Sequence, residues 1–302
     1  CPPWTWCGFK THRVWRCGNR GTVADALIEK PTIGNFMPVL DGGFSLQYAP
    51  LLEYREGKGR ILFCQLEVTG RSETEPAAMR MVTNLLQSLE NPPENKLRSW
   101  SILGGETFRN EIAKLGFRNP AASQDTQVLV IGPGAERYPD LTRMVEGGTR
   151  VLCFGLKAKE LNALFPGKIN AKDLKNQPSR LANLNYPEFA GISNMDTYFQ
   201  TRLDYAVTKN DAELDRIMIG KGSVVICSVT ADKLDYRTLF HLRTSFRRRS
   251  NLMSRLLNNA GIPSECVLLK RFAESPKAKP WLNSFYVQDP VEEDNPYRYY
   301  HW

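Results

Sequence analysis

The sequence predicts an α/β protein whose main domain is an open parallel β-sheet covered by helices. Short aliphatic runs such as Val128 to Ile131 alternate with helical segments, as in sheets buried on both faces. A glycine-rich strand motif occurs twice, which indicates a duplicated domain. The 302 residues suffice for about two domains, and 42% hydrophobic with 24% charged residues is an ordinary globular composition.

Strand and helix signals alternate most clearly after residue 98. Runs of four aliphatic or aromatic residues indicate strands, while glycines and prolines mark the ends of the helices. We expect strands at Trp100 to Leu103, Val128 to Ile131, Val151 to Phe154 and Val224 to Cys227, and helices at Thr107 to Leu115, Tyr138 to Val145, Lys157 to Leu164 and Tyr236 to Asn259.

The repeated motif is Gly-Lys-Gly followed by an apolar strand. Its two copies are Gly57 to Cys64 and Gly220 to Cys227, and a helix with a closing Asn and Leu pair follows each. The first copy begins too near the start of the chain for a whole domain to precede it, whereas the second copy has room for one. The first copy is therefore interpreted as truncated.

These signals divide the chain into four parts. We expect residues 1–90 to be the C-terminal part of a truncated domain, residues 91–97 a proline-containing linker, residues 98–265 a complete domain, and residues 266–302 an aromatic tail. The chain begins at Cys1 without an initiator Met or a signal-like pattern, so we interpret it as a piece of a longer protein.

Composition and charge argue against two classes of partner. No apolar run approaches the length of about 18 to 20 residues that a membrane span needs. The net charge of +8 is scattered, and no nucleic-acid-binding signature accompanies the basic helix near the C-terminus. We therefore interpret its arginines as a solvated and partly ion-paired helix face, at positions Arg243, Arg247, Arg248, Arg249 and Arg255.

No catalytic or metal-binding motif is complete. Among seven cysteines, no C-x-x-C pairs with a second one, so we expect neither a metal nor a cofactor. Cys64, Cys153 and Cys227 lie inside apolar strands, where thiols are usually small buried hydrophobes. The Ser193 segment lacks the second glycine of a nucleophile elbow.

The remaining polar signals are weak. The Gly132-Pro133-Gly134 turn lacks the third glycine of a dinucleotide loop and is interpreted as a turn with positive φ. Acidic residues stand in polar sequence and are interpreted as solvated surface acids, at Glu73, Glu75, Glu188 and positions 292–294.

The closing segment holds four aromatic rings and an arginine close together. Tyr297, Tyr299 and Trp302 could stack on sugar rings while Arg298 bonds hydroxyl groups. The alternative, which we favour, is a docking tail whose rings fill a groove on its own or a neighbouring domain.

Three segments resemble the C-terminal region of large multidomain bacterial glycoside hydrolases of the family 2-like, β-galactosidase type. They are Gly57 to Arg71, Gly191 to Asp196 and Asp294 to Trp302. The resemblance implies flavodoxin-like domains of the class I glutamine amidotransferase type, without amidotransferase activity. It also implies that the paired catalytic Glu residues belong to an upstream (β/α)8 barrel that is not among these residues.

The sequence therefore predicts a non-catalytic accessory region that supports assembly or substrate access in a carbohydrate-degrading enzyme. The implied partners are the upstream catalytic domain, carbohydrate and further copies of the chain, and such a parent would be secreted or periplasmic. Nucleic acid and membrane are not expected partners. The candidate carbohydrate or docking residues are Tyr297, Arg298, Tyr299, Trp302 and Asp196.

Two alternatives remain open at this point. One is a stand-alone amidotransferase- or ThuA-like hydrolase that uses Cys64 or Asp196 at a strand end, where open α/β folds place ligands. The other is a carbohydrate-binding module centred on Tyr297, Tyr299 and Trp302.

Overall fold

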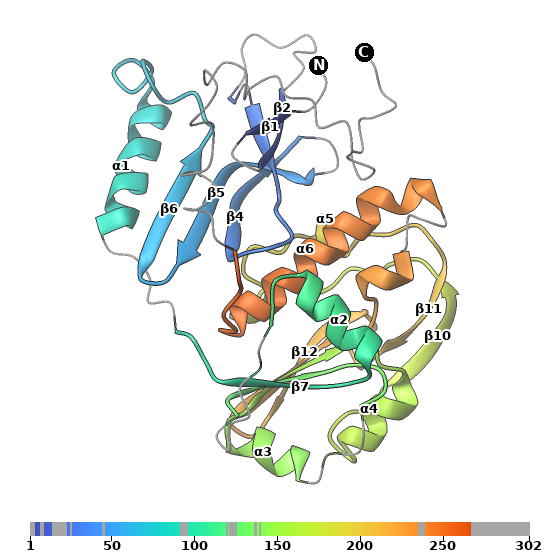
Figure 1. Ribbon diagram of the computed structural model, residues 1–302. Helices are drawn as coiled ribbons and strands as arrows, with labels where there is room; N and C mark the ends of the chain where they lie inside the picture. The colour runs from blue at the N-terminus through green and yellow to red at the C-terminus, as the bar shows by residue number, and fades with distance from the viewer. Residues whose placement is uncertain are drawn as a thin grey trace. The chain divides into compact units, whose positions relative to one another are not determined.

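The computed structural model forms two compact units (Figure 1). Unit 1 comprises Cys1–Pro31, Phe36–Asn95 and Cys266–Trp302, and unit 2 comprises Thr32–Asn35 and Lys96–Glu265. The structure describes residues 4–6, 9–13, 23–24, 26–43, 46–90, 96–118, 120, 126–135, 138, 140–234 and 239–266. The expected linker lies almost entirely outside this set, and so does the aromatic tail, apart from Cys266.

Unit 1 is an antiparallel sheet with one helix. Its strands lie in the order β1-β2-β3-β5-β4, and β6 pairs with β5. Ala24, Leu27, Tyr48 and Leu66 form a buried cluster, against which Met81 of the helix packs. The elements are β1 (Trp4–Trp6), β2 (Phe9–Arg13), β3 (Ala26–Glu29), β4 (Phe36–Gly42), β5 (Tyr48–Glu56), β6 (Gly59–Cys64) and α1 (Pro76–Glu90).

Unit 2 is built on a five-stranded sheet in the order β12-β13-β9-β8-β7. β7 (Trp100–Leu103), β8 (Val128–Ile131), β9 (Arg150–Phe154) and β13 (Gly222–Cys227) are parallel, and β12 (Leu214–Ile219) is antiparallel to β13. All residues of β8 and β13 are buried, because both faces of the sheet are covered. The expected parallel strands are thus confirmed.

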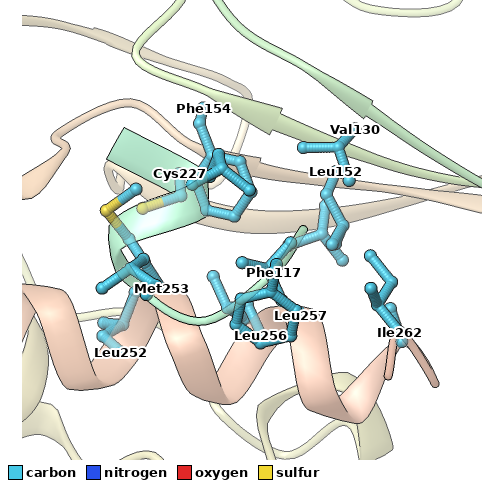
Figure 2. Close-up of a cluster of buried hydrophobic side chains, with 14 of the residues drawn as sticks. Phe117, Val130, Leu152, Phe154, Cys227, Leu252, Met253, Leu256, Leu257 and Ile262 are labelled. Atoms are coloured by element: carbon cyan, nitrogen blue, oxygen red, sulfur yellow. The ribbon is translucent and has the colours of Figure 1, made fainter. Parts of the chain in front are cut away.

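Helices cover both faces of this sheet. α2 (Glu106–Lys114) and α6 (Arg243–Asn259) share one core with Val130, Leu152 and Phe154, where Figure 2 shows Leu252, Met253, Leu256 and Leu257 of α6 gathered beneath the strands. α3 (Leu141–Gly147) and α4 (Ala158–Leu164) pack on the opposite face, against Leu129, Val151 and Ile226. The α/β class is confirmed for this unit.

The strand order differs from that of a typical flavodoxin-like sheet. Such a sheet places its first strand inside, in the order 2-1-3-4-5. Among the described residues of unit 2, β7 lies at the edge and the parallel strands follow one another in chain order. What is shown is therefore a mostly parallel α/β sheet rather than a particular family of them.

Shorter elements surround the sheet. An antiparallel ribbon joins β10 (Lys172–Gln177) to β11 (Leu203–Val207). The remaining elements are α5 (Asn194–Thr197) and the 3₁₀ turns η2 (Pro187–Phe189), η3 (Ala231–Leu234) and η4 (Phe240–Leu242). All four of these short elements pack against α6. None of the described helices has the length and apolar character that crossing a membrane demands.

Both copies of the Gly-Lys-Gly motif form antiparallel hairpins. In the first, Leu51 lies opposite Cys64 and Glu56 opposite Gly59; in the second, the corresponding residues, Leu214 with Cys227 and Ile219 with Gly222, are paired in the same register. The turns begin with Gly57 at φ 57° and Gly220 at φ 60°, which L-residues rarely adopt. The sequence echo therefore corresponds to two hairpins of one design.

The predicted first residues of two helices, α6 and α3, are wrong. α6 begins at Arg243 rather than Tyr236, because Phe240–Leu242 form a 3₁₀ turn, and residues 235–238 lie outside the described set. α3 begins at Leu141 rather than Tyr138, after Asp140 at φ 61°. A residue with positive φ interrupts a helix, and Asp is, after Gly, one of the few residue types that adopt this conformation, so Asp140 was an available signal for the later start.

Candidate functional site

The carboxyl edge of the unit 2 sheet is where an open α/β fold would place a ligand. The connections after β7 and β8 lead to helices on opposite faces, α2 and α3, so a crevice is expected between them. Instead, the Gly105 N–H donates to the Pro133 carbonyl at 2.8 Å. The Phe108 ring lies so close to Gly132 that a Cβ there would sit 2.3 Å from it. Backbone and an aromatic ring fill this position.

The turn after β9 has the strand-to-helix form of a nucleophile elbow but carries no side chain at its key position. Gly155, with φ 65°, follows β9 directly, and α4 begins shortly afterwards, at Ala158. A Cβ at Gly155 would lie 3.3 Å from Thr230 Oγ1 and 3.5 Å from the Pro133 ring. A catalytic Ser or Cys needs this strained position in order to expose its nucleophile, and here the neighbours leave little room for one.

A fully buried ion pair lies in the interior of unit 2. Arg249 on α6 and Glu213, which precedes β12, are 1% and 0% exposed, with 3.4 Å between Nη2 and Oε1. The same Nη2 donates to the Thr197 carbonyl at 2.6 Å, and the guanidinium lies 5.3 Å from the centre of the Phe199 ring. Burial raises the pKa of Glu213, and the charge of Arg249 opposes this shift.

The neighbouring arginine is buried as well. Burial lowers the pKa of Arg248, while the charge of Asp196 acts in the opposite direction. Asp196 is 1% exposed and closes the capping box of α5, where its Oδ2 accepts from the Ser193 N–H at 2.8 Å and the Ser193 hydroxyl at 3.0 Å. This carboxylate is thus a buried cap, without the exposed oxygen that a general base would present.

A third buried carboxylate holds the turn before β12. Asp215 accepts hydrogen bonds from the Thr208 hydroxyl, from Asn210 Nδ2 at 2.6 Å and from the Arg216 N–H at 2.8 Å. These donors satisfy both of its oxygens. Its role is to fix the loop between β11 and β12.

The two thiols inside the sheet of unit 2 are buried, and burial raises the pKa of both. Cys153 and Cys227 are 1% and 0% exposed, as the sequence predicted. Burial raises the pKa of Cys227 to about 11 and lifts the pKa of Cys153 well above its usual range. A reactive cysteine needs the opposite, an accessible thiol with a lowered pKa. Cys64 differs from the prediction in being only half-buried, at the end of β6.

Two sequence interpretations need correction. The arginines of α6 were expected on a solvated face, yet Arg243, Arg248, Arg249 and Arg255 are all buried, because the sheet covers one side of the helix and short elements cover the other. Glu188 was expected to be solvated, but its side chain is 11% exposed and pairs with Arg216 at 3.1 Å. Glu73 and Glu75 are exposed as predicted.

Of the candidate binding residues, the structure places only one. Asp196 lies on α5, which packs against α6, whereas Tyr297, Arg298, Tyr299 and Trp302 lie outside the described residues. In the expected glycine turn, Gly134 has a positive φ, as predicted. Gly132 lies against the Phe108 ring, where a larger residue would collide with it. Throughout the described ranges, no three His, Cys, Asp or Glu side chains gather as a metal would require.

Glu213 and Asp215, whose carboxylates organise the interior of unit 2, were not predicted from the sequence. Both stand in the run from Glu213 to Ile219, where charged and apolar residues alternate in part. An acid at the start of a strand, combined with an arginine inside an apolar helix stripe, was the available signal for the Glu213–Arg249 pair.

The chain matches no family model, no curated protein and no solved structure with which it was compared.

Proposed function

We propose that this chain is a non-catalytic accessory region of a larger carbohydrate-degrading glycoside hydrolase, with the bond-breaking residues elsewhere in the parent protein. Its second unit would be an amidotransferase-like α/β domain that has become a scaffold for assembly or substrate access. The parallel sheet with helices on both faces and the edge hairpin support the domain type, although the strand order differs from the flavodoxin-like one.

The observation that carries this proposal is the packing of the described loops after β7, β8 and β9 against one another at the carboxyl edge of the sheet. At the elbow after β9 stands Gly155, and the adjacent loops are joined by the Gly105 to Pro133 hydrogen bond. Glycosidic hydrolysis needs two accessible carboxyl groups roughly 5 to 9.5 Å apart across a sugar. Asp196, Glu213 and Asp215 are instead buried and held by arginines or by hydrogen-bond donors.

The proposal predicts that the purified chain has no hydrolytic turnover and that the described thiols Cys153 and Cys227 do not react fast. We expect no release of nitrophenol from a panel of nitrophenyl glycosides and no ammonia from glutamine. We also expect Cys153 and Cys227 to react with an aromatic disulfide reagent only after denaturation, because their thiolates are disfavoured by burial.

Three single substitutions at candidate catalytic residues distinguish this proposal from the alternative of a stand-alone hydrolase. Cys64→Ser, Cys227→Ser and Asp196→Asn are compared with the parent chain after circular dichroism has shown that each is folded. Turnover that one of these substitutions abolishes in a folded protein would establish a catalytic residue here and refute the accessory role.

A further inference from the structure

Unit 2 is not continuous in the sequence. Besides Lys96–Glu265, it takes in Thr32–Asn35, four residues that lie between β3 and β4 along the chain. We call these four residues the clasp segment. The contacts that the structure describes between the clasp segment and the rest of unit 2 lie at the C-terminal end of α6 and just after α2.

Two side chains of α6 donate hydrogen bonds to the clasp segment. Arg255 Nη1 donates to Asn35 Oδ1 at 3.0 Å, and Asn258 Nδ2 donates to the Gly34 carbonyl at 3.2 Å. Arg255 and Asn258 are only 3% and 7% exposed, and Gly34 is buried as well. A buried donor that loses its acceptor destabilises the fold, because the cost of removing it from water is no longer repaid. The clasp segment therefore supplies acceptors that the interior of unit 2 uses.

Two glycines shape this contact. Gly34 has a φ of 97°, which L-residues rarely adopt. Gly116, which follows α2, has a φ of 90°, and a Cβ there would lie 2.9 Å from Ile33 Cγ2 and 2.9 Å from the Glu265 carbonyl oxygen. The Glu265 N–H donates to the Gly116 carbonyl at 2.7 Å. The clasp segment and the last residue of unit 2 therefore meet at Gly116.

The start of the longer segment of unit 2 also reaches the end of α6. The Arg98 N–H donates to the Gly261 carbonyl at 2.9 Å, and Arg98 Nη1 donates to the Ala260 carbonyl at 3.0 Å. The last carbonyls of a helix have no partner within the helix, so these bonds satisfy them. Phe117 and Ile262 lie in the buried cluster that α6 forms with the sheet (Figure 2). Stretches that are far apart in the sequence thus meet where α6 ends.

We propose that the clasp segment is a structural part of unit 2, so that unit 2 folds as a domain of two sequence segments rather than from Lys96–Glu265 alone. The clasp segment leads directly into β4, which begins at Phe36. The folding of unit 2 then depends on four residues that the sequence places between two strands of unit 1. This inference does not depend on the proposed function.

Hydrogen exchange of the 302-residue chain and of its Asn35→Ala variant tests this proposal. The substitution removes the oxygen to which Arg255 donates, and a hydrogen bond to a charged group stabilises a fold enough to change exchange about tenfold. Every residue of β8 is buried, so its amides report the opening of unit 2 as a whole. We expect the amides of β8 and of the last turn of α6 to exchange about tenfold faster in the variant.

Two further variants of the clasp segment serve as controls, after circular dichroism has shown that each is folded. Asn35→Asp keeps an oxygen that can accept from Arg255, and it should keep the protection of β8. Thr32→Ala shortens a side chain that takes no part in the bonds from Arg255 and Asn258, and it should also exchange like the parent chain.

Unchanged exchange of β8 in Asn35→Ala would overturn the proposal, because unit 2 would then not need the clasp segment. A loss of protection confined to β3 and β4 would also overturn it and would assign the segment to unit 1. Equal losses in Asn35→Ala and Asn35→Asp would show that the bond from Arg255 is not what holds the segment. Hydrolytic turnover of the chain would bear on the proposed function alone.

Discussion

Arg249 is the residue on which the interior charge balance of unit 2 depends. It neutralises Glu213 and donates to the Thr197 carbonyl in a region with almost no solvent contact. Arg249→Met would leave the carboxylate buried without its countercharge, and removing one partner of such a pair typically costs about 3 to 5 kcal/mol. We expect a loss of this size in the free energy of unfolding at pH 7, measured by urea titration with circular dichroism.

The pH dependence of that loss identifies its electrostatic origin. Burial already raises the pKa of Glu213, and without Arg249 nothing opposes the shift, so the folded protein binds a proton more tightly than the unfolded chain. Stability of the variant should therefore rise as the pH falls toward about 4.3, the ordinary Glu value. Arg249→Met combined with Glu213→Gln should recover most of the loss at pH 7. A deficit that is equal at pH 4.5 and pH 7 would instead point to lost packing.

At the scale of elements, the sequence predicted best where one physical requirement dominated. The parallel strands were identified because burial on both faces leaves uninterrupted aliphatic runs such as Val128 to Ile131. β10 and β12 escaped prediction because they are polar or edge strands, with Asp215 and Arg216 inside β12. The buried arginines escaped because α5 and the 3₁₀ turns that cover them are too short to show periodicity.

The two hairpins provide an element-scale prediction with an internal control. Gly222→Ala places a methyl group 2.3 Å from two carbonyl oxygens, so the turn and the end of α3 must separate. Overpacking of this kind costs about 1 to 3 kcal/mol. Gly59→Ala, at the matching position of the first hairpin, meets one carbonyl at 3.3 Å and should change the urea midpoint little. Equal losses from the two substitutions would show that the hairpins have equivalent surroundings.

At the scale of the whole molecule, the buried thiols make unit 2 sensitive to alkaline conditions. Cys227, whose pKa is about 11, and Cys153, whose pKa is also raised, keep their protons in the folded state, whereas unfolded thiols lose theirs near about pH 8.5. The unfolded chain therefore binds fewer protons above that pH, and the free energy of unfolding should fall by about 1.4 kcal/mol per pH unit for each thiol.

In unit 1 the buried phenol of Tyr54, whose pKa burial also raises, has an unfolded pKa of about 10, so its contribution is lost only at higher pH. Urea titrations at pH 7, 8.5 and 9.5 should show that the free energy of unfolding of the parent chain falls as the pH rises. In a Cys153→Ala, Cys227→Ala double variant, it should fall less with pH. The remaining cysteines are common to both proteins, so the difference in slope isolates this pair. If the free energy of unfolding falls equally with pH in the parent chain and in the double variant, the two thiols ionise without unfolding the sheet. The interior around β9 and β13 would then be open to solvent.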